Sequence, residues 1–198
     1  GINIRYDGPH ISFNSQTSYQ YIQDKMGIDQ DFSPRNIFYG QNKIRQHMYC
    51  QEFTVKSVNK SRYHWITGAF VFRQTINRKV DLSRFTDTTR HLTNSGIPTQ
   101  GIAFYHQSTL DLLQGLSCSV GLRYDYEHAR CDFSKVQQPL NGNGETKSLE
   151  QFNRSLHFGQ FTPRFSMQYL SSHNQLFYAS VSKGYKAGGF NVSFLNND

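Results

Sequence analysis

The feature that most constrains the fold is a strict two-residue alternation between residues 116 and 126. The even positions are apolar or aromatic: Leu116, Cys118, Val120, Leu122, Tyr124 and Tyr126. The odd positions are small or polar: Ser117, Ser119, Gly121, Arg123 and Asp125. Because successive side chains of a β-strand point to opposite faces, this pattern predicts a strand with one apolar face and one polar face.

The same period recurs along the chain. Alternation is clear in residues 11–21, 47–55 and 164–169, while residues 63–72, 101–110 and 175–185 resemble strands with apolar groups on both faces. No segment carries a convincing apolar stripe at the 3.6-residue period of a helix. The sequence therefore predicts an all-β chain.

The connections between these segments alternate in length. Short connections are expected near residues 8–9, 58–61, 111–115 and 171–174, and long polar links at 24–45, 76–97 and 130–152. The first two strands are expected near 2–7 and 10–23. This order predicts eight antiparallel strands joined up-and-down, with tight turns at one rim and long loops at the other.

Short turns on one side and long loops on the other are typical of an outer-membrane β-barrel. The composition fits a spanning barrel, with 16 Phe, 12 Tyr and one Trp in a chain whose mean hydropathy is −0.64. The most apolar stretch, residues 66–72, is far shorter than the roughly 20 residues of a spanning helix. A soluble β-sandwich also alternates and stays an alternative, although its connections seldom separate so cleanly by length.

Charge and cysteine content exclude little. The formal net charge is +7, but no run of five like charges occurs, so we expect no nucleic-acid partner. Cys50, Cys118 and Cys131 are expected to be free thiols, with a bridge between Cys50 and Cys131 left open. The chain opens at Gly1 with neither Met nor a signal peptide, so we expect a processed chain or an excised piece.

No catalytic motif is present. The eight histidines are scattered without HExxH spacing, and neither Gly-x-Ser-x-Gly nor a phosphate-binding loop occurs. We therefore predict no enzyme, no catalytic residue, no cofactor and no metal site. His47 and His64 would face each other if they lay across one hairpin, although ordinary polar wall residues are the simpler interpretation. Glu127 and His128 are expected at a strand end.

One motif is specific. Residues 176–191, Leu-Phe-Tyr-Ala-Ser-Val-Ser-Lys-Gly-Tyr-Lys-Ala-Gly-Gly-Phe-Asn, closely resemble a barrel segment of TonB-dependent outer-membrane receptors. Four further segments fit that family in the same order: residues 51–55, 65–72, 121–125 and 161–166. An acidic segment, Asp29 to Ser33, lies where the family has an acidic loop. The resemblance covers about residues 10 to 192.

This resemblance implies an up-and-down antiparallel β-barrel segment, about eight strands of a 22-stranded outer-membrane barrel. Residues 1–198 would be a partial barrel domain with the plug domain absent. The implied function is the import of a nutrient such as a ferric siderophore into the periplasm of a Gram-negative bacterium. The implied partners are that ligand, outer-membrane lipid, and the TonB system acting through the missing plug.

No ligand-binding residue is assigned from the sequence. The long links are the candidates, because they carry aromatic and basic groups: Phe38, Tyr39, Lys43, Arg45, Arg78, Lys79, Arg84 and Arg90. An anionic iron complex would suit such a rim, and so would lipid headgroups. Lys183 and Lys186 are expected near the outer rim, in contact with lipopolysaccharide phosphates or with water.

On the strand that begins at residue 116, Arg123 and Asp125 are expected to pair on the lumen side. Tyr124 and Tyr126 on the opposite face, and Trp65, fit an aromatic girdle at the membrane interface. Two other functions stay open. Eight strands can close a small barrel, which would be a stand-alone outer-membrane protein with a structural or adhesive role. A soluble β-sandwich or a lipocalin-like binder is the third.

Overall fold

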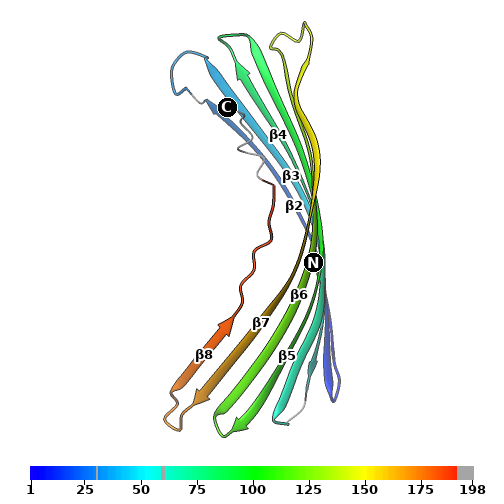
Figure 1. Cartoon of the computed structure of the whole chain (residues 1–198), viewed down its shortest axis with the longest axis vertical. Helices are drawn as coiled ribbons and strands as arrows, with labels where there is room; N and C mark the ends of the chain where they lie inside the picture. Colours follow the sequence, from blue (N-terminus) through cyan, green and yellow to red (C-terminus); the bar gives the residue numbers. More distant parts are fainter. Residues whose placement is uncertain (30, 59–60, 191–198) are drawn as a thin grey trace.

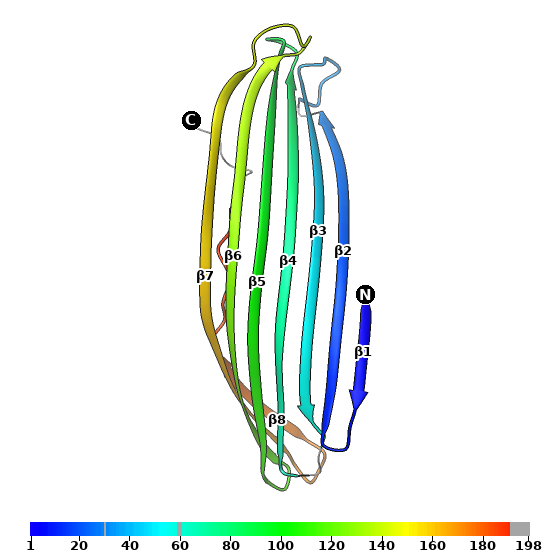
Figure 2. The same ribbon diagram turned by 90° about the vertical axis from the view of Figure 1, so that its right-hand side faces the viewer.

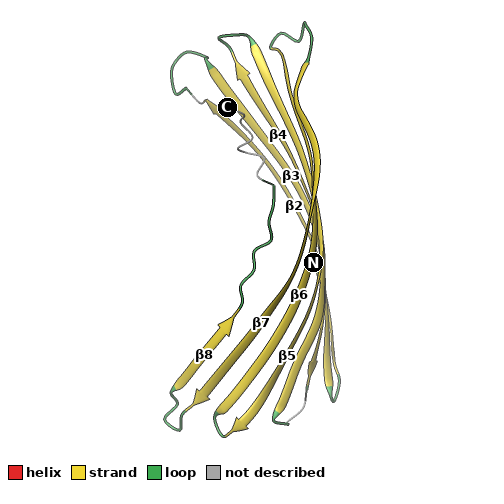
Figure 3. Ribbon diagram, in the orientation of Figure 1, coloured by secondary structure: helices red, strands yellow, loops and turns green. Residues whose placement is uncertain are grey.

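A single antiparallel sheet contains all the regular structure of the described chain (Figure 3). The computed structural model describes residues 1–29, 31–58 and 61–190. The strands are β1 (Ile2–Asp7), β2 (Ile11–Asp29), β3 (Phe38–Ser57), β4 (Tyr63–Arg84), β5 (Thr89–Leu113), β6 (Leu116–Pro139), β7 (Lys147–Leu170) and β8 (Leu176–Ser182). Each strand pairs with its neighbours in sequence, in the order β1 to β8 (Figure 2). The described part of the chain contains no helix that could cross a membrane.

The predicted up-and-down topology is confirmed, as are short turns at one rim, although residues 59–60 of the turn expected at 58–61 lie outside the described residues. The β5–β6 turn shows why glycine is needed there. Gly115 has a positive φ of 80°, and its carbonyl oxygen accepts a hydrogen bond from the amide of Leu170 at 2.7 Å. A Cβ at this position would overlap the carbonyl oxygen of Leu170, so the turn excludes other residues.

The predicted long loops are wrong in extent. The links expected at 24–45, 76–97 and 130–152 are mostly strand, because β2 to β7 continue to tip segments that include 31–37, 85–88 and 140–146. Consequently Glu127 and His128 lie inside β6 and not at a strand end. The middle strands have 19 to 25 residues, about twice the length of an ordinary barrel-spanning strand.

The sheet curves into part of a cylinder wall (Figure 1). Odd positions of β6 face the concave side, where Ser117, Ala129, Cys131 and Phe133 are buried. Even positions face outward, and Leu122 there is 56% exposed. Residues 183–190 run along the concave side, and a Cβ on Gly188 would overlap the ring of Phe158. Paired residues of neighbouring strands share a face, so the register carries this assignment across the sheet.

The sheet does not close on itself. β1 and β8 lie at opposite ends of the strand order, so no eight-stranded closed barrel and no second sandwich layer is formed by the described residues. The accessible surface is 13986 Å², against about 9,600 Å² expected for a compact soluble monomer of this mass. The chain therefore leaves much apolar surface for other molecules to cover.

Candidate functional site

A lateral row of paired residues divides the outward face of the sheet into two halves. The row, called here the boundary row, consists of Tyr19, Tyr49, Arg73, Gln100, His128 and His157. It crosses β2 to β7 near the middle of each strand. The aromatic members contact one another: the rings of Tyr19 and Tyr49 lie 4.6 Å apart, and those of His128 and His157 stack at 4.4 Å.

Between the boundary row and the short turns, no outward position of the described strands holds Asp, Glu, Lys or Arg. We call this region the apolar belt. Its large side chains include Ile2, Ile4, Tyr6, Ile11, Phe13, Phe53, Val55, Tyr63, Trp65, Val71, Ile102, Phe104, Leu110, Leu116, Val120, Leu122, Tyr124, Tyr126, Phe161, Phe165, Met167, Tyr169, Phe177 and Val181. Most of them are more than a third exposed. An exposed apolar area of this size requires an apolar environment.

The height of the apolar belt matches a membrane. On β6 it extends from Leu116 to Tyr126, about 11 residues, or about 36 Å at 3.3 Å per residue. A strand tilted by about 45° would cover about 25 Å of membrane normal, the height of the lipid-facing band in outer-membrane barrels. Trp65, Tyr124 and Tyr126 all lie on this outward face, as the girdle interpretation requires.

On the other side of the boundary row, the outward face is charged. Its charged members are Lys25, Asp29, Lys43, Arg45, Lys79, Asp81, Arg90, Arg130 and Asp132. Arg130 pairs with Asp132 at 2.8 Å, and Arg90 pairs with Asp81. Hydration of these groups requires water on the outward side. The upper half of each hairpin therefore lies beyond the belt.

At the level of the apolar belt, charges lie on the concave face. Arg123 and Asp125 form the predicted ion pair, with Nη2 to Oδ1 at 2.7 Å and Nε at 2.9 Å from both carboxylate oxygens. Tyr105 donates a hydrogen bond to Glu52 at 2.9 Å and contacts the Thr54 hydroxyl at 2.8 Å. At this level the sheet therefore has a polar concave face and an apolar outward face.

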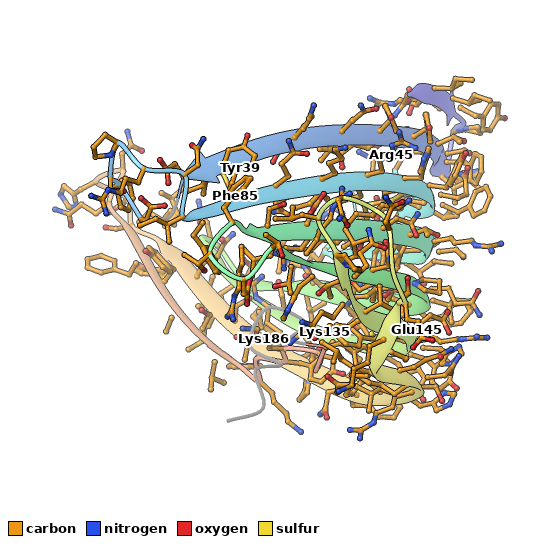
Figure 4. The ribbon with its side chains drawn as sticks, turned by 90° about the horizontal axis from the view of Figure 1, so that it is seen from above. Tyr39, Arg45, Phe85, Lys135, Glu145 and Lys186 are labelled. Carbon is orange, nitrogen blue, oxygen red and sulfur yellow. The ribbon has the colours of Figure 1, made fainter. Side chains whose placement is uncertain are left out.

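Beyond the boundary row, basic groups gather on the concave face. We call the set Arg78, Arg84, His91, Lys135 and Arg154 the upper concave patch. On this face of the described strands, the acids beyond the boundary row are Asp24 on β2 and Glu150, the partner of Lys135 across β6 and β7. Figure 4 looks down on the hairpin tips, with Lys135 labelled.

Aromatic rings accompany these charges. The guanidinium of Arg84 lies 5.4 Å from the ring of Phe38, and that of Arg154 lies 5.3 Å from the ring of Phe152. Burial lowers the pKa of His91, and the nearby charges of Arg84 and Lys135 lower it further. The patch therefore presents both positive charge and flat apolar surface.

The predicted ligand-loop residues divide between the two faces. Phe38, Arg78 and Arg84 point to the concave side, whereas the other five point outward: Tyr39, Lys43, Arg45, Lys79 and Arg90. Sequence reasoning did not single out His91, Lys135 or Arg154. Alternation by two from Phe133 would have placed Lys135 on the same face as that buried ring.

His47 and His64 do not face each other across a hairpin, so the alternative of a histidine pair is wrong. The register pairs His47 with Thr75 and His64 with Thr109, so the two rings lie on opposite faces and at different heights. His64 lies 3.7 Å from Asp111 near the short turns. His47 instead contacts the Tyr19 hydroxyl at 2.9 Å.

Two further predictions are settled by the structure. All three cysteines are free, so no bridge joins Cys50 to Cys131. Lys183 is not at the outer rim: its amide donates a hydrogen bond to the carbonyl of Pro163 at 3.0 Å, at the level of the apolar belt.

Comparison with known proteins identifies the fold. A family model described as "TonB dependent receptor-like, beta-barrel" matches residues 1–198. The chain belongs to this TonB-dependent receptor family. Such receptors are transporters rather than enzymes, and their barrels are outer-membrane proteins of Gram-negative bacteria. The resemblance drawn from residues 176–191 is therefore confirmed.

One solved structure agrees with the TonB-dependent receptor fold. The ferric yersiniabactin uptake receptor FyuA from Yersinia pestis is similar with a TM-score of 0.80 at 14% identity, over 95% of this chain. The chain spans only 28% of the length of FyuA. The ferric-catecholate import receptor Fiu from E. coli K12 (11% identity, 89% of this chain, 36% of that chain) and the ferric citrate transporter FecA (7%, 88%, 33%) match with TM-scores of 0.36 and 0.39.

Proposed function

We propose that residues 1–198 form part of the barrel wall of a receptor that imports a nutrient such as a ferric siderophore into the periplasm. The ligand binds from outside, and the TonB system opens a path by acting on a plug domain that is separate from this segment. Outer-membrane lipid covers the outward face. This chain contributes part of the barrel wall and its hairpin tips, and it carries out no chemical reaction.

The observation that supports this proposal most strongly is the division of charge between the two faces. At the level of the apolar belt, Asp, Glu, Lys and Arg occur on the concave face of the described strands and not on the outward face. A soluble sheet gains nothing from such a division when both faces meet water. A wall between lipid and a wet lumen requires it.

The upper concave patch favours an anionic iron complex as the ligand class. Its three arginines and Lys135 outnumber Asp24 and Glu150, the two carboxylates that the described strands carry on this face beyond the boundary row. Two of the guanidinium groups lie over phenylalanine rings. Ferric chelates with net negative charge and flat aromatic parts would meet both features. Ferric yersiniabactin is the compound that FyuA takes up and is not assigned to this chain.

The test uses the full-length receptor in a Gram-negative strain that lacks its own ferric-complex receptors. Radioactive iron uptake is measured with a panel of anionic, neutral and cationic ferric chelates, with and without TonB. We expect TonB-dependent uptake of at least one anionic chelate. Uptake that does not need TonB, or none from any chelate in a correctly inserted receptor, would refute the proposal.

A double variant tests whether the upper concave patch binds the ligand. The double variant Arg84→Gln, Lys135→Gln removes two concave charges, and we expect binding of the anionic chelate to weaken by about tenfold or more. The control, Lys43→Gln with Arg45→Gln, removes two outward charges of the neighbouring hairpin and should leave binding unchanged. Equal losses in both variants would show that the concave face does not select the ligand.

A further inference from the structure

A groove of about 770 Å³ crosses the boundary row on the outward face. Its floor is formed by Val71 and Ile102, which are 44% and 37% exposed. Tyr19 and Tyr49 line one side, and His128 lines the other. Arg73, on β4 at the centre of the boundary row, also lines the groove.

Arg73 is the only member of the boundary row with a permanent charge. It is exposed, and within the described residues its guanidinium makes no ion pair or hydrogen bond. Outward carboxylates beyond the row are engaged elsewhere, since Asp81 pairs with Arg90 and Asp132 with Arg130. The third, Asp29, accepts a hydrogen bond from the amide of Asp31 at 3.3 Å. The apolar belt on the other side contains no carboxylate among the described strands. A lone cation therefore borders an apolar groove.

The groove combines an apolar part with a positively charged edge. Val71 and Ile102 belong to the apolar belt, so the lower part suits hydrocarbon chains. Arg73 at the upper edge has a planar fork of donors that matches the oxygens of a phosphate. The imidazole of His128, stacked on His157, adds an N–H donor nearby. A phosphate monoester attached to acyl chains would satisfy both parts at once.

We propose that this groove binds a phosphorylated lipid of the outer leaflet, with its phosphate on Arg73 and its acyl chains over Val71 and Ile102. The inference rests on the proposed function, because the apolar belt must lie in the outer membrane. Arg73 then marks where the acyl region ends. The groove holds the lipid in one orientation, whereas the rest of the belt meets acyl chains without selection.

The test uses native mass spectrometry of the full-length receptor in detergent. The probes are bis-phosphorylated lipid A, the same lipid with its phosphates removed, and phosphatidylcholine. We expect lipid A to be retained roughly tenfold more strongly than its dephosphorylated form. Inorganic phosphate should not displace it, because the acyl chains supply part of the binding. Equal retention of both forms, or displacement by inorganic phosphate, would overturn the proposal.

Matched variants locate the site. Arg73→Gln should remove the preference for phosphorylated lipid, whereas Arg73→Lys should keep part of it. Lys79→Gln removes a charge from the same strand and face but outside the groove, so it should keep the full preference. The same loss in K79Q as in R73Q would overturn the proposal. Heat-modifiable electrophoretic mobility shows that each variant is folded.

Failure of this inference differs from failure of the proposed function. If the receptor is absent from the outer-membrane fraction or imports no iron complex with TonB present, the proposed function fails. If insertion and uptake are intact and only phosphate selectivity is missing, the groove inference alone fails.

Discussion

Gly68 leaves a gap on the concave face of β4 that a ring from the next strand fills. Tyr105 on β5 lies across it and reaches Glu52 and Thr54 on β3, so one side chain links three strands. A Cβ at Gly68 would overlap the Tyr105 ring and the carbonyl oxygen of Phe53. Glycine inside a strand thus serves close approach rather than flexibility.

We expect Gly68→Ala to destabilise the full-length receptor by about 2–4 kcal/mol, through overpacking and the loss of the Tyr105 hydrogen bonds. The measurement is the urea midpoint of unfolding in detergent. Gly121→Ala is the control, because its Cβ would lie 3.8 Å from the nearest atoms of Gln107. A G68A midpoint equal to that of G121A would contradict this account.

Asp31 organises the tip between β2 and β3. Its carboxylate accepts hydrogen bonds from the hydroxyl of Ser33, and from the amides of Phe38 at 2.9 Å, Ser33 at 3.0 Å and Ile37 at 3.2 Å. These bonds, that of the Ser33 hydroxyl foremost, lower the pKa of Asp31 to about 2 from an ordinary value of 3.8. The ionised carboxylate therefore holds the tip.

Because the pKa of Asp31 is lowered, its contribution is complete above about pH 4 and is lost as the pH falls towards 2. Hydrogen-exchange protection of the Phe38 amide, corrected for the intrinsic rate, should follow this window. Asp31→Asn should lower that protection at pH 7. Asp24→Asn is the control, since Asp24 makes no side-chain hydrogen bond within the described residues. Unchanged protection in D31N would refute the role.

Along β6, the alternation changes phase at the boundary row. On β6 the apolar positions are even up to Tyr126, but beyond it the buried ones are odd, namely Ala129, Cys131 and Phe133. No β-bulge interrupts β6 between these two parts. The cause is the surroundings, since the outward face leaves lipid and meets water. The strand continues while its apolar side changes.

This change of phase explains which parts of the fold the sequence could predict. Strand number, order and the short turns follow from alternation and spacing, because lipid enforces a strict pattern in the belt. The upper strand halves resemble loops in the sequence, since their pattern carries the opposite parity and more polar residues. The upper concave patch is hidden for the same reason: Lys135 and His91 fall in those upper halves.

The apolar belt predicts that an introduced charge destabilises the barrel more on the outward face of the sheet than on its concave face. Leu122 lies near mid-belt, outward and 56% exposed, and Leu122→Arg should destabilise the inserted barrel by about 2–4 kcal/mol. Ser119→Arg places the same charge on the concave face of β6. It should cost about 1 kcal/mol, through the lost hydrogen bond to Thr109 at 2.8 Å.

The measurement is reversible unfolding of the full-length receptor from lipid vesicles, followed by tryptophan fluorescence. A larger loss in S119R than in L122R would exchange the two faces and contradict the assignment of the belt.

The two rims of the sheet should lie on opposite sides of the membrane. Asn141 lies in the tip between β6 and β7, and Ser172 in the short turn between β7 and β8. In intact cells, a membrane-impermeant maleimide should label Asn141→Cys at once, and Ser172→Cys only after the outer membrane is permeabilised.

The unmodified receptor, with its three free cysteines in this segment, gives the background for this labelling. Labelling of S172C but not N141C in intact cells would invert the topology and place the upper concave patch in the periplasm, where it could not meet an external ligand.

The continuation of paired strands beyond the apolar belt has a consequence for selectivity. Under the proposed function, a ligand arriving from outside would meet hydrogen-bonded backbone that is already ordered, so binding would lose little chain entropy. Affinity is then set by the alternate side chains that point inward from each hairpin. Substituting one of these side chains would alter the contacts with the ligand, while the backbone hydrogen bonds would keep the strands in register. We therefore expect single substitutions in this wall to change ligand specificity without changing the backbone structure.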